Sequence, residues 1–195
     1  MATENVVLMK QARETLSDKW GLAVGITTIY MVITIVVGSP KDIGPVLQAI
    51  IEGPLQFGLA IFSLSLVRGK GVSISQLFEG FNDFIRILVA YLLMGLFVLL
   101  WALLLIVPGI IAALAYSQTF FILVDDKSIS ARDALRKSKS MMYGHKKKLF
   151  YLGLRFFGWF LLGVLSLGIG FLWILPYFYV TMAKFYEEVS VKAPK

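Results

Sequence analysis

The sequence predicts an all-α, polytopic membrane protein with six transmembrane helices, arranged as three hairpins that are each preceded by an amphipathic cytoplasmic helix. Composition, the length of the uncharged runs and the placement of the basic residues support this prediction. Of the 195 residues, 58% are hydrophobic and 16% are charged, and the mean hydropathy is +0.79. Soluble domains carry about 25% charged and about 45–50% apolar residues. We therefore expect one integral membrane domain over residues 1–195.

The first two spans are predicted from runs that are uncharged or nearly so. The run 20–40 carries no charge, and the run 43–67 carries only Glu52. Each is long enough to cross a hydrocarbon core of about 30 Å, which requires about 20 helical residues. With the segment that precedes them, they make up a first unit of about residues 1–67.

The longest uncharged run, 87–124, contains Pro108 and Gly109 near its centre. One helix over this run would be about 57 Å long at about 1.5 Å per residue, nearly twice the hydrocarbon core. Because proline interrupts a helix and glycine turns freely, the pair predicts a hairpin turn between spans at 87–107 and 110–124. The fourth span is short, so it either borrows residues from the turn, lies where the bilayer is thin, or does not cross fully.

The last apolar run, 149–183, is also too long for one crossing. Gly168 and Gly170 lie near its midpoint. We expect the chain to turn there and to form two short spans of about 17 residues each. The three predicted units are then about residues 1–67, 68–126 and 127–188, followed by a short tail, 189–195.

The basic residues test this topology independently of the apolar runs. Seventeen of the 19 Lys and Arg residues fall in the N-terminal, inter-hairpin and C-terminal segments, whereas Lys41 alone falls in an outer turn and Arg155 falls within a span. Segments rich in Lys and Arg stay on the cytoplasmic side. We therefore expect a multi-pass protein of the cell membrane with both termini in the cytoplasm.

The segments before the second and third hairpins carry apolar residues at helical spacing. This holds for 74–85 and again for 131–142, where Ser138 is the one polar member of the apolar set. Ser130 and Asp133 form a capping-box-like start to the second segment. The N-terminal segment repeats the pattern more weakly. Each segment is therefore predicted to be an amphipathic helix at the inner membrane surface.

Several motifs resemble a known family. They are PGI at 108–110, FILVDD at 121–126, ISARDALRKSKSMMYGHKKKLFYL at 129–152, GW at 158–159 and LGIGFLWILPY at 167–177. In this order they resemble the bacterial and archaeal integral membrane family called domain of unknown function 975. The resemblance implies a membrane fold but no activity, because the activity of that family is itself unassigned. A more distant likeness to the membrane domain of some glycerophosphodiester phosphodiesterases suggests work related to lipids.

Glu52 is the strongest candidate for a functional residue inside a span, because an ionisable side chain in hydrocarbon is costly. Gln48 and Gln56 lie four residues away on either side, so the three residues form a polar stripe on one helix face. The stripe predicts a cavity, a proton or cation site, or an interhelical contact. Two interpretations stay open. Glu52 acts directly, or it is structural, being either neutral or close to the outer interface and hydrogen-bonded to a neighbouring helix.

Arg155 is the other ionisable residue within a predicted span, and it departs from the family pattern, where a small polar residue is expected. Its depth differs from that of Glu52 by about 12 Å along the membrane normal. We therefore expect Arg155 to extend to the cytoplasmic head groups and not to pair with Glu52.

The segment 127–148 carries eight basic residues on a predicted helix whose other face is apolar. Such a helix suits an anionic membrane surface, where each nearby Lys or Arg contributes about 1 kcal/mol. The residues expected to face anionic lipid are Arg132, Arg136, Lys137, Lys139, Lys146, Lys147 and Lys148. The alternative is that these charges only set the topology.

No motif in the sequence points to an enzyme. There is no cysteine and one histidine, His145, so we expect neither a metal site nor a cofactor. The basic segment offers only Tyr143 for base stacking, so nucleic-acid binding is not expected. Gly21 and Gly25 are spaced as in closely packed membrane helices, which is compatible with a homo-oligomer.

The leading hypothesis is therefore a non-catalytic inner-membrane protein that binds or organises anionic lipid, or a membrane-active or partner peptide. The alternative is a small transporter or channel that uses the polar stripe around Glu52. A water-accessible path that reaches Glu52 from one side would favour the transporter or channel, and a lateral apolar groove above the basic helix would favour lipid binding.

Overall fold

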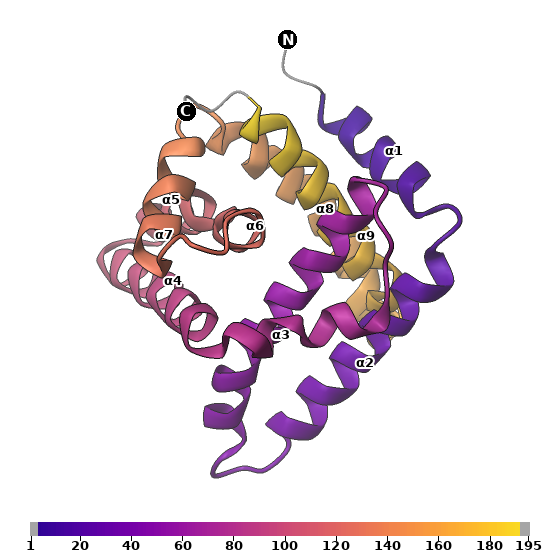
Figure 1. Cartoon of the computed structure of the whole chain (residues 1–195), viewed down its shortest axis with the longest axis horizontal. Coiled ribbons are helices and arrows are strands. Elements are labelled where there is room, and N and C mark those ends of the chain that lie inside the picture. The colour runs from indigo at the N-terminus through magenta and orange to yellow at the C-terminus, as the bar shows by residue number, and fades with distance from the viewer. Residues whose placement is uncertain (1–3, 192–195) are drawn as a thin grey trace.

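The computed structural model describes residues 4–191, and every regular element in that range is a helix (Figure 1). In chain order they are α1 (Asn5–Leu16), α2 (Trp20–Gly38), α3 (Gly44–Val67), the 3-10 helix η1 (Ile74–Asp83), α4 (Phe84–Leu104), α5 (Ile106–Tyr116), α6 (Thr119–Asp125), α7 (Ala131–Met141), α8 (Lys146–Leu165) and α9 (Phe171–Ser190). The all-α prediction is confirmed for this part of the chain.

Five stretches of the described chain are long and apolar enough to cross a membrane. They are Trp20–Gly38, Gly44–Val67, Ile74–Leu104, Ile106–Asp125 and Lys146–Leu165. Helix α9 is not among them, because Lys184, Glu187 and Glu188 lie in its C-terminal third. Five such stretches are consistent with a membrane protein, whereas the sixth predicted span stays a prediction.

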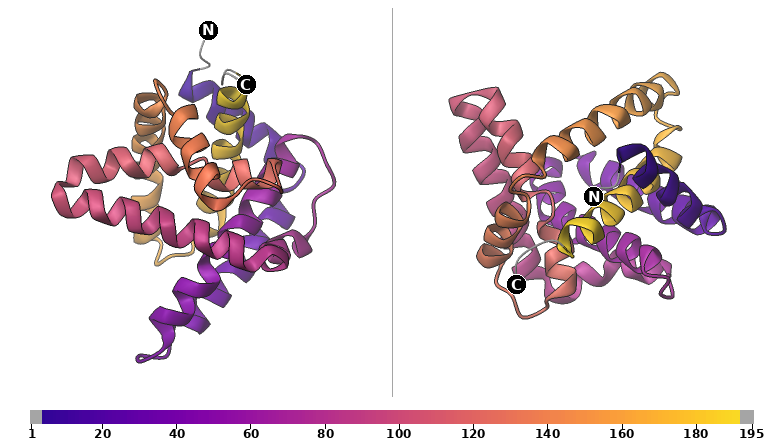
Figure 2. Two further views of the ribbon diagram at one scale, coloured as in Figure 1. Left: turned by 60° about the vertical axis from the view of Figure 1, so that its left-hand side comes forward. Right: turned by 90° about the horizontal axis from the view of Figure 1, so that it is seen from above.

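Three helix pairs in the described chain, α2–α3, α4–α5 and α8–α9, form arms that extend in different directions from a shared centre (Figure 2). In the left view of Figure 2 the connections at the ends of the arms lie on the left and lower side, whereas the start of α1 and the end of α9 lie at the top. Apolar side chains near these connections are exposed, among them Val36 (63%), Leu103 (74%) and Leu165 (78%). So many exposed apolar side chains favour an apolar environment around the arms.

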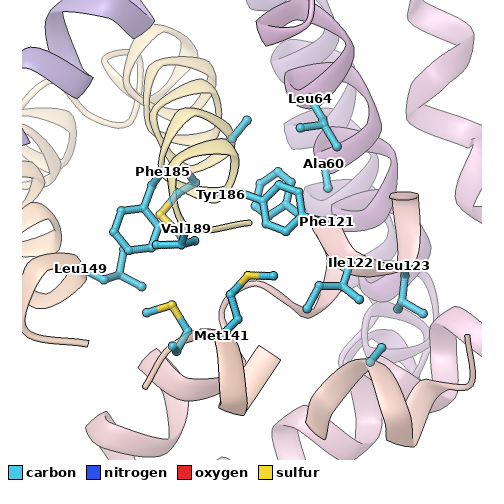
Figure 3. Close-up of a cluster of buried hydrophobic side chains, with 14 of the residues drawn as sticks. Ala60, Leu64, Phe121, Ile122, Leu123, Met141, Leu149, Phe185, Tyr186 and Val189 are labelled. Atoms are coloured by element: carbon cyan, nitrogen blue, oxygen red, sulfur yellow. The ribbon is translucent and has the colours of Figure 1, made fainter. Parts of the chain in front are cut away.

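The core lies where the arms meet, and α9 runs through it. Helices α1, α2, α3 and α8 all contact α9. Figure 3 shows Phe185, Tyr186 and Val189 of α9 between Leu149 of α8 and Phe121 of α6. The rings of Tyr186 and Phe121 stack with their centroids 5.4 Å apart. The core therefore draws on all three predicted units.

An ion cluster joins the C-terminal ends of α3, α6 and α9. The guanidinium of Arg68 donates two hydrogen bonds to Asp125, at 2.5 and 2.9 Å, and one to Glu187 at 2.6 Å. The hydroxyl of Tyr186 donates to the same Asp125 carboxylate at 2.7 Å. The hydrogen bonds to Asp125 and Glu187 raise the pKa of Arg68 above its already high ordinary value. One cation therefore links the ends of three helices.

The chain leaves the helix between α4 and α5 at Leu105, and not at the predicted turn residues Pro108 and Gly109. Leu105 is extended, with φ −161° and ψ 147°. Pro108 lies in the first turn of α5, where a residue needs no intrahelical N–H bond. A Cβ added to Gly109 would lie 2.7 Å from the Cβ of Ala102. The pair therefore starts α5 and lets it approach α4 closely, while the turn itself is formed by an ordinary leucine.

The connection between α8 and α9 contains the other two predicted turn residues, Gly168 and Gly170. Gly168 has a φ of 91°, a conformation that favours glycine, and Leu167 before it also has a positive φ of 55°. The hydroxyl of Ser166 accepts a hydrogen bond from the N–H of Gly170 at 2.8 Å. These local contacts turn the chain into α9.

The fourth predicted span is divided into two helices, because α5 ends before Ser117 and α6 starts after Gln118. Ser138 of α7 satisfies backbone groups at this break. Its hydroxyl donates to the carbonyl oxygen of Ala115 at 2.8 Å and accepts from the N–H of Gln118 at 3.2 Å. Ser138 is fully buried. The apolar face of α7 thus packs against α4, α5 and α6, and its one polar residue has a structural role.

The segment before α4 is the 3-10 helix η1 and not the predicted α-helix, and it lies against α3. A Cβ added to Gly58 would overlap the carbonyl oxygen of Leu77, and one added to Gly80 would overlap the carbonyl oxygen of Pro54. These two glycines therefore allow the backbones of α3 and η1 to touch.

Candidate functional site

The polar stripe on α3 contacts both neighbouring helices. The Oε1 atom of Glu52 accepts hydrogen bonds from the hydroxyl of Tyr30 on α2 and from the side-chain amide of Gln56, the latter at 2.9 Å. On the side of α4, a Cβ added to Gly53 would lie 2.8 Å from the Cβ of Tyr91. Because Gly53 has no side chain, α4 can bring Tyr91 close to the carboxylate.

A cavity of about 410 Å³, here called the Glu52 cavity, opens beside this carboxylate. Its lining comes from α2, α3 and α4 and consists of Tyr30, Thr34, Pro45, Gln48, Ala49, Glu52, Gln56 and Tyr91. All three residues of the predicted polar stripe therefore line one cavity. Within the described chain, none of the residues that line it is basic.

The part of α3 that follows Glu52 is tightly packed. Leu55, Leu59 and Phe62 are each at most 4% exposed. Helix η1 covers the same part of α3, where the backbones touch at Gly58. The Glu52 cavity therefore extends toward Pro45 at the start of α3, while apolar side chains fill the space in the other direction.

A second cavity, of about 230 Å³ and here called the lysine-rimmed groove, lies between the α4–α5 arm and α7–α8. Its apolar lining consists of Trp101, Pro108, Ile111, Ala112, Ala115 and Tyr116. Lys139 of α7 and Lys146 at the start of α8 complete the lining. Neither lysine forms an ion pair with a residue of the range 4–191.

The other basic residues predicted to face lipid are not gathered at this groove. Lys148 pairs with Glu188 at 2.5 Å, where the two side chains are 15% and 12% exposed, and it lies 5.7 Å from the centre of the Phe185 ring. Arg136 pairs with Asp133 at 3.6 Å on the surface. Three further members of the set are exposed and lie outside the lysine-rimmed groove, namely Arg132, Lys137 and Lys147. Lys148 is thus part of the core packing, and two members of the predicted set, Lys139 and Lys146, adjoin the lysine-rimmed groove.

Arg155 lines a different groove from Glu52. It is exposed on α8, and with Lys148 and Tyr151 it borders a groove of about 670 Å³ between α8 and the start of α1. Asn5 of α1 donates a hydrogen bond to the backbone carbonyl of Lys148 across this groove, at 3.0 Å. The structure therefore gives Arg155 no part in the Glu52 cavity.

The two tyrosines beside Glu52 were not identified from the sequence. A phenol hydroxyl in the middle of an apolar helix needs a polar partner, and that requirement was the available signal for Tyr30 and Tyr91. The partner itself depends on how α2 and α4 are rotated toward α3, which spacing along one helix does not reveal. No cluster of three or more His, Cys, Asp or Glu side chains suited to a metal ion occurs between residues 4 and 191.

The family model described as "Protein of unknown function (DUF975)" matches residues 1–114 and 103–193. The two matches cover nearly the whole chain and confirm the resemblance seen in the sequence motifs. Neither a curated protein nor a solved structure matches the chain.

Proposed function

Because the chain belongs to the DUF975 family and has five stretches that are long and apolar enough to cross a membrane, we propose that it is a non-catalytic multi-pass membrane protein that binds anionic lipid. The observation that carries this proposal is the lysine-rimmed groove, where an apolar lining meets two ammonium groups that form no ion pair within residues 4–191. An anionic lipid has both matching parts. Its acyl chain would contact residues such as Ile111, and its phosphate would lie near Lys139 and Lys146.

The proposal includes the six-helix topology with both termini in the cytoplasm. The charge asymmetry supports it, because segments rich in Lys and Arg stay on the cytoplasmic side. In this topology Lys139 and Lys146 lie at the inner surface, where each lysine near anionic lipid contributes about 1 kcal/mol.

The transporter alternative would use the Glu52 cavity. The cavity reaches the carboxylate from the side of Pro45, as this alternative requires, whereas Leu55, Leu59 and Phe62 are buried in the part of α3 that follows Glu52. The packing therefore favours binding over passage, and we place lipid binding first.

The test compares two doubly substituted proteins by native mass spectrometry after release from bilayer discs that contain phosphatidylglycerol and phosphatidylcholine. Lys139→Gln with Lys146→Gln removes the two groove lysines. Lys127→Gln with Lys147→Gln removes the same charge from exposed positions of the same segment. We expect the first pair to weaken phosphatidylglycerol binding about tenfold or more, since two contributions of about 1 kcal/mol are lost.

The control pair should retain lipid nearly as the unmodified protein does, and added salt should weaken binding by the unmodified protein. Equal losses in both pairs would contradict the proposal, because they would show a general surface charge effect. Retention of a peptide in place of lipid would also contradict it.

A further inference from the structure

The Glu52 cavity adjoins an apolar groove. This groove, of about 490 Å³ and here called the α4 groove, lies between α3, α4 and the α5–α6 segment. It shares Gln56 and Tyr91 with the Glu52 cavity. From there it follows α4 past Leu92 and Leu96 to Val98. The polar Glu52 cavity and the apolar α4 groove thus adjoin at Gln56 and Tyr91, and together they are here called the hollow.

The hollow lies where two arms separate. The α2–α3 and α4–α5 arms touch at Gly53 and Tyr91 and then extend in different directions (Figure 2). The α4 side of the hollow is open, because Leu92 is 51% exposed and Leu96 is 48% exposed. In the proposed topology these residues face hydrocarbon, so a ligand enters sideways from the bilayer.

The charge of the hollow selects the kind of ligand. Both hydrogen bonds to the Glu52 carboxylate end on Oε1, so within residues 4–191 no protein donor binds Oε2. No basic side chain of the described chain lines either part of the hollow. A carboxylate in hydrocarbon is stabilised by a cation or by hydrogen-bond donors. An ammonium group supplies both, whereas a phosphate would be repelled.

We propose that the Glu52 cavity and the α4 groove together bind an amphipathic amine. Its ammonium group lies at the carboxylate of Glu52, with the side-chain carbonyl groups of Gln48 and Gln56 as further acceptors in the same cavity. Its apolar chain lies along α4. Among the described residues this site shares Tyr116 alone with the lysine-rimmed groove, and it takes a ligand of opposite charge, so it does not depend on lipid binding there.

The experiment uses the full chain in bilayer discs of phosphatidylcholine and a hexadecylammonium probe with a photoreactive diazirine in its chain. After illumination, the labelled peptides are identified by mass spectrometry. We expect labels on α4 and on the facing α5–α6 segment. Unlabelled hexadecylammonium should compete about tenfold better than hexadecanol or hexadecyl sulfate, because a hydrogen bond to a charged group is worth about a factor of ten.

Two substitutions test the two parts of the site. Glu52→Gln keeps an acceptor for Tyr30 but removes the charge, so the advantage of hexadecylammonium over hexadecanol should disappear. Gly95→Phe fills the α4 groove, and nothing lies within 4 Å of a Cβ added there, so the labels on α4 should be lost. Gly153→Phe is the matched control, because this glycine of α8 is equally open and lies outside the hollow.

Gly95→Phe leaves Glu52 unchanged, so it tests the proposal even if Glu52→Gln fails to fold. The amine proposal would be overturned if the labels were spread over all exposed apolar helices, or if the preference for ammonium persisted in Glu52→Gln. It would also be overturned if butylammonium competed equally well, because that result would identify a site for a free cation. Phosphatidylglycerol binding by Gly95→Phe reports on the lysine-rimmed groove alone, so failure of one proposal is distinguishable from failure of the other.

Discussion

The hydroxyl of Ser138 stabilises the break between α5 and α6, because it bonds a carbonyl oxygen and an N–H that helix geometry leaves without partners. A buried backbone group without a partner is costly. Serine is small enough to lie on the packed face of α7 and still has both a donor and an acceptor. A polar residue on an apolar helix face is therefore explained here by a contact 20 or more residues away in the chain.

Substitution Ser138→Ala should destabilise the protein, because it leaves the Ala115 carbonyl and the Gln118 N–H buried without this partner. We expect the free energy of unfolding to fall by about 1–3 kcal/mol, measured by SDS titration of the purified protein. Ser140→Ala, at an exposed position of the same helix, should change it by less than about 0.5 kcal/mol. Equal effects of the two substitutions would show that the hydroxyl contributes nothing at the break.

Spacing along one helix predicted which residues share a face, and for this reason Gln48, Glu52 and Gln56 could be grouped before the structure was known. The partner of Glu52 could not be predicted, because Tyr30 lies 22 residues earlier on another helix. Which tyrosine meets the carboxylate depends on the rotation of α2 and α4 about their axes. The same limit applies to the lysine-rimmed groove, which combines side chains from α4, α5, α7 and α8.

At the scale of elements, the turn of the α4–α5 arm is not formed by Pro108 and Gly109, as the sequence predicted. Leu105 forms the turn, whereas Pro108 and Gly109 lie in the first turn of α5 and let α5 pack closely on α4. The length of the uncharged run required a reversal somewhere near its centre, and the chain reverses there. The predicted position of the reversal was wrong by a few residues. Proline is well tolerated in the first turn of a helix, so α5 starts before Pro108. Leu105, which leaves the helix, has no property that would mark it in the sequence.

Gly109→Leu should force α4 and α5 apart, because its Cβ would lie 2.7 Å from that of Ala102. Overpacking of this kind lowers the free energy of unfolding by about 1–3 kcal/mol, which SDS titration would detect. Gly158→Leu places the same side chain on α8, where nothing lies within 4 Å of the added Cβ. If both substitutions lowered stability equally, close packing at Gly109 would not be the cause.

For the whole molecule, composition and run length predicted an all-α fold with repeated reversals, but not the central position of α9. The buried surface of α9 depends on contacts with α1, α2, α3 and α8, which the sequence pattern of one helix does not reveal. The different directions of the three arms could not be predicted from the sequence either. It depends on the close contacts at Gly53, Gly58 and Gly80, where only the assembled backbones show that no side chain fits.

The proposed topology predicts which positions are reachable from outside the cell. In this cysteine-free chain, Asp42→Cys in the α2–α3 connection should react with an impermeant thiol reagent added to intact cells. Ser140→Cys on α7 should react only after the cells are opened, because the positive-inside rule places the basic segment in the cytoplasm. Labelling of position 140 in intact cells would rule out the six-helix topology.

The ion cluster around Arg68 has a consequence for biosynthesis. A chain is made from its N-terminus, so the first two arms are complete before α9 exists. Arg68 meets Asp125 as soon as the second arm is complete, but its bond to Glu187 and the phenol of Tyr186 come only with the last helix. Helix α9 also fills the centre of the molecule. We therefore expect the first two arms to form a loosely associated intermediate until α9 has been synthesised. The inner faces of these arms would be open to lipid or to an insertion factor during that time.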